Sequence, residues 1–474
     1  MRAPMPAQVL SVQQLQRVHF VGIGGAGLSG IARIMLAHGV AVSGSDAADS
    51  PTLAALRELG AHCVVGHAAE HVGDAEVVVV STAVREDNPE VVAARQRAIA
   101  VWSRAAALVS CMSGYRVLAV AGTHGKTTTT AMLTTALLHT GAEPSYAIGA
   151  DLTASGINAA LGSGEDFVVE ADESDGAFLA YAPFGAIVTN VDADHLDMWG
   201  TEVAYRQAFT DFLGRIVAGG FLVACIDDPG AAALAAQARQ RGIEAVTVAL
   251  EVPADLRAVD VSTIDGVTTA SVVRDGEALG RLRLQVPGRH YAADALAALA
   301  MGLRLGHSAA ALLEGLAAFS GSRRRMEVKG EVAGVRVRDS YAHHPVEIAA
   351  DLEAARSIAS GGRLVVCFQP HLVSRTKALG PQMATALGAA DIVVVCDIYV
   401  AREDPEEGVT GLQLAAAVPL PDSQVRYAPT LDDAVDQLVQ LTRTGDLVVT
   451  LGAGDVTTVG PRVLEALAAR EDTR

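Results

Sequence analysis

The sequence predicts an α/β protein built from parallel sheets. Short runs rich in valine and isoleucine alternate along the chain with glycine-containing turns and with stretches rich in alanine and leucine. This alternation is typical of βαβ units. The pattern restarts three times, and a glycine-rich turn follows the first strand of each of the first two blocks. We therefore expect three α/β domains, over residues 1–112, 113–321 and 322–474.

The elements of each block follow from local pattern. The valine- and isoleucine-rich runs that we expect to form strands lie at Arg17–Ile23, Ala41–Ser45, Glu76–Thr82, Arg116–Ala121, Asp166–Ala171, Ala186–Asn190, Gly220–Ile226, Arg363–Phe368, Asp391–Ile398 and Asp446–Leu451. Between about residues 246 and 286, the turn pairs Asp265-Gly266 and Asp275-Gly276 separate short strands, which predicts antiparallel hairpins added to the central sheet. An alanine-rich helix is expected at Tyr291–Leu305.

Bulk composition excludes several classes of function. The 474 residues carry a formal net charge of −18, which argues against a nucleic-acid partner or an anionic membrane surface. The N-terminal stretch lacks the apolar core of a signal peptide, and no apolar run is long enough to span a bilayer. The five cysteines are scattered and form no CxxC pair, as expected for a reducing compartment. We expect a cytoplasmic protein without membrane insertion, and oligomeric state is left open.

A phosphate-binding loop is predicted where the strand at Arg116–Ala121 meets a helix. Gly122-Thr123-His124-Gly125-Lys126-Thr127-Thr128 follows this strand directly. Glycines let backbone N–H groups turn toward phosphate oxygens, and the helix N-terminus adds a favourable dipole. The lysine can reach the β- and γ-phosphates, and the threonine after it can place a hydroxyl on Mg²⁺. The spacing GxxGKT departs from the generic form, which has four residues between the glycines.

Polar residues follow the next two expected strands. Glu170-Ala171-Asp172-Glu173-Ser174-Asp175 comes after one of them, and Asn190–Asp197, which includes His195, comes after the other. Both segments lie at the sheet edge where α/β proteins bind ligands. A carboxylate, an imidazole and the threonine hydroxyl suit Mg²⁺ or Mn²⁺ held with phosphates. For Asp172, Glu173 and Asp175 a solvated loop or a helix N-cap is an equally good interpretation.

The first glycine-rich turn predicts a second phosphate site. Gly22, Gly24 and Gly27 fit the pattern GxGxxG after the first strand, and Asp46 stands after the second strand. Alone, this pattern suits a nicotinamide dinucleotide in a Rossmann-like domain, with Asp46 on a ribose hydroxyl. It suits the diphosphate of a nucleotide sugar equally well.

The third block places basic and imidazole groups after its strands. Arg323-Arg324-Arg325 is a compact basic cluster in an acidic chain. Asp339–Glu347 contains His343-His344, and Phe368–Thr376 contains His371 and Arg375. Adjacent histidines on a strand point apart, which disfavours a shared metal ion. Binding of a carboxylate by Arg375 is the more natural use.

Taken together, the motifs resemble the Mur ligase family over essentially the whole chain. The matching segments are GIGGAGLSGIA (22–32), AGTHGKTTT (121–129), EADESD (170–175), NVDADHLD (190–197), PGRH (287–290), SYAHHPVE (340–347) and FQPHLVSRT (368–376). The resemblance implies a Rossmann-like N-terminal domain that binds a UDP-sugar, a central P-loop domain that binds ATP, and a Rossmann-like C-terminal domain that binds an amino acid. It further implies cytoplasmic peptidoglycan precursor synthesis, in which L-alanine is joined to the lactyl carboxylate of UDP-N-acetylmuramate through an acyl phosphate.

The resemblance also implies which residues meet each ligand. The UDP-sugar would contact Gly24, Gly25, Ala26, Gly27, Ser29, Asp46, His67 and Ser81. ATP would contact Gly122, Thr123, His124, Gly125, Lys126, Thr127, Thr128, Arg324, Arg325 and Asp339. Mg²⁺ or Mn²⁺ would be held by Thr127, Glu170 and His195. The residues expected to serve catalysis are Lys126, His195, His343 and Arg375, with His343 a hypothesis for the base that deprotonates alanine.

Some positions depart from the family pattern, and other functions compete. Tyr291 and Asp294 stand where asparagines usually meet the adenine, and Leu372 stands where many members have an arginine, so Arg375 would carry more of the amino-acid binding.

One alternative function is that of the recycling ligase, which joins a preformed tripeptide to UDP-N-acetylmuramate. A dehydrogenase that uses Gly22–Gly27 is another, but it leaves the second glycine loop without a role. A non-catalytic nucleotide-binding module would be favoured by loss of Lys126, Glu170 or His195, which are all present.

Overall fold

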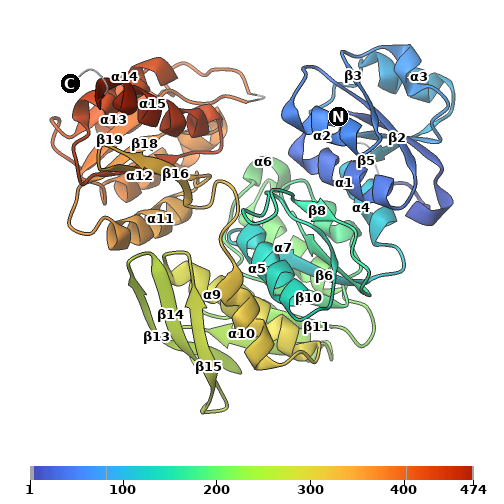
Figure 1. Cartoon of the computed structure of the whole chain (residues 1–474). Helices are drawn as coiled ribbons and strands as arrows, with labels where there is room; N and C mark the ends of the chain where they lie inside the picture. The colour runs from blue at the N-terminus through green and yellow to red at the C-terminus, as the bar shows by residue number, and fades with distance from the viewer. Residues whose placement is uncertain (1–4, 82, 402, 472–474) are drawn as a thin grey trace. The chain divides into compact units, whose positions relative to one another are not determined.

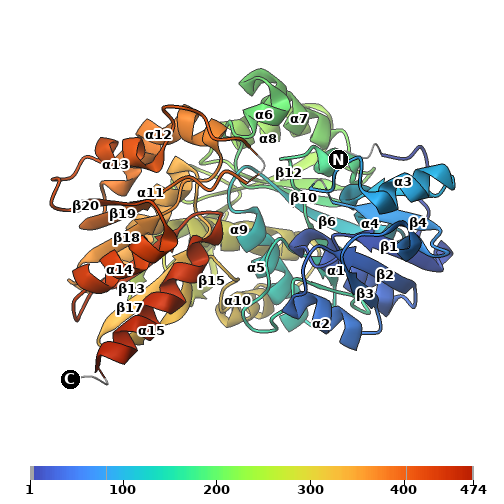
Figure 2. The same ribbon diagram turned by 90° about the horizontal axis from the view of Figure 1, so that it is seen from above.

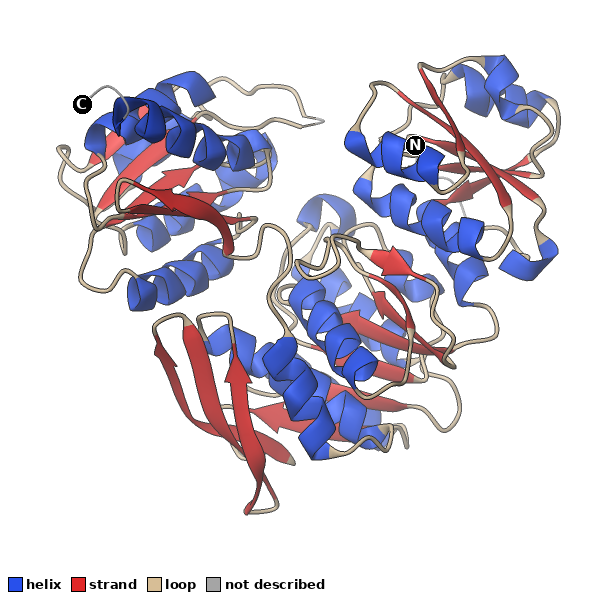
Figure 3. Ribbon diagram, viewed as in Figure 1, coloured by secondary structure: helices blue, strands red, loops and turns tan. Residues whose placement is uncertain are grey.

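A computed structural model describes residues 5–81, 83–401 and 403–471 (Figure 1). The chain forms two compact units. The first comprises residues up to 259 together with 272–280 and 293–319, and the second comprises 260–271, 281–292 and the residues from 320 onward. Helices and strands alternate along most of the chain, and Figure 3 distinguishes the two by colour. The predicted three-domain α/β class is confirmed by three separate sheets.

The N-terminal sheet has five parallel strands in the order β3-β2-β1-β4-β5. Its elements are β1 (Arg17–Val21), α1 (Ala26–Ala37), β2 (Ala41–Asp46), α2 (Pro51–Glu58), β3 (His62–Val65), η2 (Ala69–Val72), β4 (Val77–Val80), α3 (Pro89–Gln96), β5 (Ala100–Ser103) and α4 (Arg104–Met112). Alternate residues of β4 enter different apolar cores, so helices cover both faces. Figure 2 shows α2 and α3 on opposite sides of this sheet.

The expected strands of this sheet are present with shorter ends. The first strand ends at Val21 rather than Ile23, because Gly22 has φ +81° and turns the backbone out of the extended conformation. The strand expected at Glu76–Thr82 ends at Val80, and Thr82 lies outside the described residues. The strands β3 and β5 are short edge strands that the sequence pattern did not indicate.

The central sheet has ten strands in the order β15-β14-β13-β12-β11-β10-β6-β9-β7-β8. Its strands are β6 (Arg116–Ala121), β7 (Ser145–Ala147), β8 (Ala159–Ala160), β9 (Asp166–Glu170), β10 (Gly185–Val188), β11 (Phe221–Cys225), β12 (Glu244–Ala249), β13 (Leu256–Ile264), β14 (Val267–Arg274) and β15 (Glu277–Leu284). The strand β6 lies between β9 and β10 and runs parallel to both, so their carboxyl ends share one edge. That edge carries the predicted site.

Helices complete the central sheet. They are α5 (Lys126–His139), α6 (Leu196–Trp199), α7 (Glu202–Leu213), α8 (Pro229–Gln240), α9 (Arg289–Arg304) and α10 (Ala309–Ala318). The helix α10 packs closely on α5, where a Cβ at Gly315 would lie 2.7 Å from the Cα of Ala136. The alanine-rich helix predicted at Tyr291–Leu305 is α9, shifted by one or two residues.

The predicted hairpins are present, with one correction. The strands β13, β14 and β15 are joined by two-residue turns in which Asp265-Gly266 and Asp275-Gly276 all have positive φ, as type I′ turns require. The expected hairpin region began near residue 246, but that stretch belongs to β12, which pairs parallel to β11. Its valines serve a buried parallel strand rather than a hairpin.

The C-terminal sheet has six strands in the order β16-β17-β21-β18-β19-β20. Its elements are β16 (Glu327–Val332), β17 (Val335–Ser340), α11 (Pro345–Ile358), β18 (Leu364–Phe368), α12 (Val373–Leu387), β19 (Ile392–Cys396), α13 (Gly411–Ala417), β20 (Val425–Ala428), α14 (Leu431–Leu441), β21 (Leu447–Leu451) and α15 (Val459–Glu471). The strand β16 is antiparallel and the other pairs are parallel. Separate cores lie on the two faces.

Two smaller observations bear on the expected setting of the protein. Within the described ranges, no helix combines the length and the apolar character that crossing a membrane requires. All five cysteines are buried free thiols.

Candidate active site

The glycine loop between β6 and α5 depends on two special backbone positions. Gly122 has φ +138° and Gly125, which precedes the helix, has φ +80°. A Cβ on Gly122 would lie 2.0 Å from Oγ1 of Thr189, and one on Gly125 would lie 2.5 Å from Oδ1 of Asp294. Neither glycine can therefore be replaced without moving its surroundings. The loop is pressed against the end of β10.

The end of β10 holds the loop through its side chains. The Thr189 hydroxyl donates to the carbonyl of His124 at 2.6 Å. The side-chain oxygen of Asn190 accepts from the His124 amide at 2.8 Å, and its NH₂ group donates to the His124 carbonyl at 3.1 Å. The Thr123 hydroxyl donates to the carbonyl of Asp192 at 2.7 Å. Sequence reasoning did not identify these anchoring roles, although Asn190 belongs to the polar segment that it singled out.

Lys126 lies beside a carboxylate whose role sequence reasoning left undecided. Its Nζ lies 2.8 Å from Oε2 of Glu173 and donates to the carbonyls of Gly122 and Thr123 at 2.8 and 3.0 Å. Burial lowers the pKa of Lys126, but the charges of Glu173 and Asp172 outweigh this and leave it raised. The ammonium group is therefore held charged at the mouth of the loop.

Glu173 is fully buried, so the alternative of a solvated loop is wrong for it. Burial raises the pKa of this carboxyl to about 7, even with Lys126 beside it. The Tyr205 hydroxyl lies 3.3 Å from Oε1, and the indole N–H of Trp199 donates to the Glu173 carbonyl at 3.1 Å. Glu173 therefore titrates near neutral pH while holding the loop lysine.

Two predicted metal ligands are brought together. The Thr127 hydroxyl donates to Oε1 of Glu170 at 3.1 Å, and the other oxygen of Glu170 accepts from the Gly149 amide at 2.7 Å. A hydroxyl and a carboxylate oxygen at this separation are the donor types that Mg²⁺ prefers. Thr128, the next residue of the helix, is buried.

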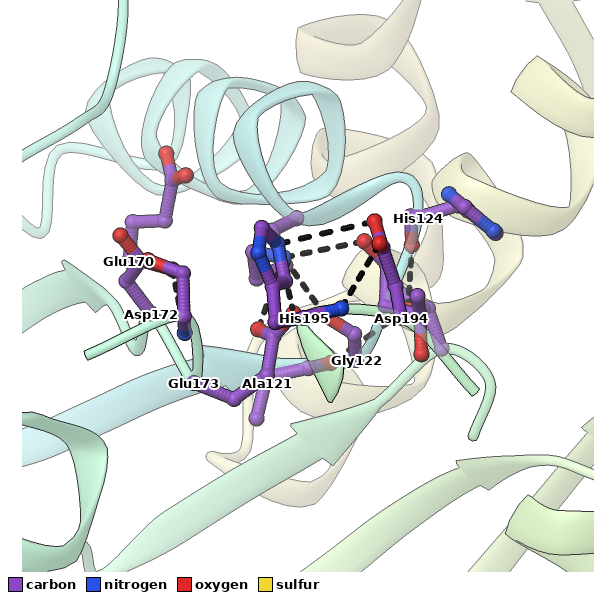
Figure 4. Close-up of polar contacts among 12 residues, drawn as sticks. Ala121, Gly122, His124, Glu170, Asp172, Glu173, Asp194 and His195 are labelled. Carbon is purple, nitrogen blue, oxygen red and sulfur yellow. Dashed lines mark hydrogen bonds and ion pairs between the residues drawn. The ribbon is translucent and has the colours of Figure 1, made fainter. Parts of the chain in front are cut away.

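The third predicted ligand, His195, lies on the other strand end. It occupies a turn with φ +51°, and its Nε2 lies 3.6 Å from Oδ2 of Asp194 and 4.0 Å from Oε1 of Glu173. Figure 4 shows these side chains around the loop, with Glu170 and Asp172 on one side of His195 and His124 on the other. The contacts thus group Thr127 with Glu170, and His195 with the Lys126–Glu173 pair.

Arg104 borders the same acidic segment. Its Nη2 lies 3.5 Å from Asp172 and 3.7 Å from Asp175. A Cβ on Gly27 would lie 3.0 Å from Cδ of this arginine. Arg104 was not among the predicted site residues, because nothing in its local sequence distinguishes it from a helix-terminal arginine.

The first glycine turn is held by the predicted aspartate. The amide of Gly24 donates to Oδ2 of Asp46 at 2.9 Å, and a Cβ on Gly22 would lie 3.6 Å from the Ser81 hydroxyl. Gly25 precedes α1, whose first residues include Ala26, Gly27 and Ser29. His67 follows β3, and its Nδ1 lies 2.9 Å from the Ser45 hydroxyl. Their contact with a UDP-sugar stays a prediction.

In the C-terminal sheet, two predicted ATP contacts bind each other. Asp339 is fully buried, and it accepts hydrogen bonds from Thr450 at 2.6 Å and Thr457 at 2.7 Å. Its Oδ2 also lies 3.3 Å from Nε of Arg324, which has φ +58°. The guanidinium groups of Arg324 and Arg325 lie 4.9 and 5.3 Å from the ring centre of Tyr341. In this arrangement Asp339 positions Arg324.

The predicted amino-acid contacts lie beside a row of rings. His343 is 5.8 Å from His371, and His371 stacks on Tyr399 at 5.7 Å. Arg375 is buried, and its Nη1 lies 3.4 Å from Nδ1 of His371. His343 Nδ1 lies 3.5 Å from Oε2 of Glu347. The structure therefore brings His343 and Arg375 to the same histidine, His371, which the site prediction omitted.

Comparison with known proteins covers almost the whole chain. Residues 17–116 match the model described as Mur ligase family, catalytic domain; residues 120–302 match the Mur ligase middle domain; and residues 324–454 match the glutamate ligase domain. The UDP-N-acetylmuramate–L-alanine ligase of Nocardioides sp. is 59% identical over 98% of this chain and 100% of that protein. The ligase of the same name from Kineococcus radiotolerans is 53% identical over 99% and 100%. The crystal structure of UDP-N-acetylmuramate-alanine ligase from Thermotoga maritima has a TM-score of 0.81 at 29% identity, covering 96% of this chain and 99% of that one.

Proposed function

The chain belongs to the Mur ligase family, and we propose that it joins L-alanine to the lactyl carboxylate of UDP-N-acetylmuramate with ATP as the phosphoryl donor. The observation that carries the proposal is the identity of 53–59% over nearly full length with proteins named for that reaction. The intact loop lysine and its surroundings support it.

The ATP phosphates would lie in the loop 122–128. Its backbone N–H groups and the N-terminus of α5 favour anionic oxygens. Lys126 would leave the Gly122 and Thr123 carbonyls, to which it donates at 2.8 and 3.0 Å, for the β- and γ-phosphates. Because Glu173 lies 2.8 Å from Nζ, the lysine would keep its charge during this move. Lys126 then stabilises charge on the transferring phosphoryl group.

A divalent cation fits the residues present. Thr127 and Glu170, whose oxygens are 3.1 Å apart, would hold Mg²⁺, and His195 would serve a second ion from the neighbouring strand end. When bound, such an ion neutralises negative charge on the phosphates. Asp194 fixes the turn by accepting from the His195 amide at 2.7 Å.

The reaction proceeds in two steps, a phosphoryl transfer and an acyl transfer. The lactyl carboxylate attacks the γ-phosphorus of ATP, forming a carboxyl–phosphate bond and releasing ADP. The amine of L-alanine then attacks the acyl carbon, and the tetrahedral intermediate expels inorganic phosphate while the amine loses a proton. Such activation is required because a free carboxylate does not condense with an amine in water.

The amino acid would be held by the C-terminal domain. Arg375 would bind the carboxylate of L-alanine as a charge-assisted pair, oriented by His371 at 3.4 Å. His343 would accept the proton from the amine. Its Nδ1 lies 3.0 Å from the Tyr341 carbonyl, which favours a proton on Nδ1 and leaves Nε2 as the acceptor.

The test is phosphate release from ATP and Mg²⁺ in the presence of UDP-N-acetylmuramate. We expect release when L-alanine is added and none with the L-Ala-γ-D-Glu-diaminopimelate tripeptide. Release with the tripeptide alone would assign the chain to the recycling reaction instead. If neither L-alanine nor the tripeptide causes phosphate release, the proposal is refuted.

A further inference from the structure

A buried carboxylate in the N-terminal sheet is surrounded by imidazoles. Glu90 lies in the first turn of α3 and is 0% exposed. Its Oε2 accepts a hydrogen bond from the Ser45 hydroxyl at 2.6 Å and lies 3.1 Å from Nδ1 of His67. Its Oε1 lies 3.1 Å from Nδ1 of His71 and 3.6 Å from Nε2 of His19. We call these residues the Glu90 cluster.

The cluster compensates a buried negative charge with histidines. Its members come from β1, β2, the loop after β3, η2 and α3. In the described part of the chain, the other charged or titratable groups of these elements form no ion pair with Glu90. These groups are Arg17, Asp46, His62, Cys63, Glu70 and Arg95. A buried carboxylate needs hydrogen-bond donors, and the Ser45 hydroxyl and the imidazole N–H groups supply them.

The electrostatics agree with this geometry. Burial raises the pKa of Glu90, but hydrogen bonds from His19, Ser45 and His67 outweigh burial and hold it at about 2. Glu90 is therefore ionised at neutral pH. The cluster is not a metal site, since nowhere in the described residues do three of its donor atoms lie within 4.8 Å of one another.

The cluster is joined to the first glycine turn through consecutive residues of β2. The Ser45 side chain donates to Glu90, while its carbonyl accepts from the Gly22 amide at 2.8 Å. The next residue, Asp46, accepts from the Gly24 amide through its side chain and from the Gly66 amide through its carbonyl. The end of β2 thus fixes the glycine turn on one side and the residue before His67 on the other.

We propose that Glu90 is a positioning residue of the UDP-sugar site, an inference that rests on the function proposed above. Its carboxylate holds Nδ1 of His67, which leaves Nε2 of that ring for the UDP diphosphate. The negative charges of a diphosphate favour the imidazolium form, so the cluster takes up a proton when the nucleotide binds. Glu90 thereby couples diphosphate binding to protonation without touching the ligand.

The experiment is titration calorimetry of the whole chain with UDP at pH 7.5, in two buffers that differ in ionisation enthalpy. The variants are Glu90→Gln and His67→Asn, and asparagine retains a donor in the Nδ1 position. The matched control is Glu86→Gln, because Glu86 is an exposed carboxylate whose ion pair is with Arg95 at 2.9 Å. ADP is titrated in parallel as a ligand of the other glycine loop.

We expect the unaltered chain to take up as much as about one proton per UDP. Glu90→Gln should weaken UDP about ten- to a hundredfold, the range for one charge-assisted hydrogen bond, and should abolish the proton uptake. ADP affinity should stay unchanged, and Glu86→Gln should behave as the unaltered chain does.

Three outcomes would overturn the inference. Glu90→Gln could bind UDP as tightly as the unaltered chain. UDP could bind the unaltered chain without proton uptake, a result that stands even if Glu90→Gln does not fold. His67→Asn could bind UDP with undiminished affinity. Failure of the unaltered chain to bind UDP while it binds ADP would refute the proposed acceptor site as well.

Discussion

Replacing Gly122 with alanine should damage the phosphate loop more than its backbone angle alone would cause. An L-residue at φ +138° costs about 1–3 kcal/mol. The new Cβ would also lie 2.0 Å from the Thr189 hydroxyl, which must then give up its hydrogen bond to the His124 carbonyl. That loss adds about 1 kcal/mol, so we expect Gly122→Ala to lower the free energy of unfolding by about 2–4 kcal/mol in total.

The matched control is Gly114→Ala. Gly114 has φ +89°, and nothing lies within 4 Å of a Cβ built there. It should show a backbone cost of only about 1 kcal/mol. ADP titration calorimetry measures the effect on the loop, and urea unfolding measures the effect on stability. Gly122→Ala should weaken ADP about 30-fold or more, whereas Gly114→Ala should not. Equal ADP affinity and equal stability for the two variants would show that the contact with Thr189 does not matter to the loop.

Four further predictions concern charged groups. Glu170→Gln should raise the Mg²⁺ concentration for half-maximal phosphate release by more than about tenfold, since even outer-sphere changes cost that much, and an unchanged requirement would argue against Glu170 as a ligand. His343→Ala should lower kcat at saturating substrates by about 10²-fold or more, and an unchanged kcat would exclude it as the base. ADP affinity should fall as pH rises through about 7, because ionised Glu173 competes with ADP for Lys126. Calorimetry of Glu173→Gln should show no such fall in ADP affinity. The pKa of Glu90 is about 2 against an ordinary 4.5, so its ionised form contributes about 3 kcal/mol to the free energy of unfolding above pH 4.5. This contribution is lost as the pH falls toward 2. Hydrogen exchange of the β1 and β4 amides should show the loss in the unaltered chain and no such pH dependence in Glu90→Gln.

Local sequence pattern was enough to predict the strands whose ends carry the site residues. The runs at β6, β9 and β10 are uninterrupted apolar segments followed by polar residues, which is the signature of buried parallel strands. The loop 122–128 was also predictable, because glycines, a lysine and a threonine follow a buried strand in the order that a phosphate loop needs. The stretch near residue 246 was misassigned because its neighbours are hairpins, and a parallel partner such as β11 leaves no mark on the local sequence.

What the pattern could not indicate depends on which strands are neighbours. Thr189 and Asn190 anchor the loop only because β10 pairs with β6. Glu173 stands in a polar segment, and its burial beside Lys126 follows from how that segment crosses the sheet edge. The contacts of His371 with His343 and Tyr399, and the contacts within the Glu90 cluster, likewise join residues that are distant in sequence and adjacent only after folding. Pairwise chemistry of this kind needs coordinates.

The proposed reaction depends on activation of the substrate carboxylate by phosphoryl transfer from ATP. The most direct test uses UDP-N-acetylmuramate labelled with ¹⁸O in the lactyl carboxylate, together with ATP, Mg²⁺ and L-alanine, and analyses the released phosphate by mass spectrometry. An acyl phosphate requires one carboxylate oxygen to leave with the phosphate, so we expect one ¹⁸O atom in each molecule of inorganic phosphate. Phosphate without ¹⁸O would exclude an acyl phosphate, because ATP would then be hydrolysed by water rather than attacked by the carboxylate.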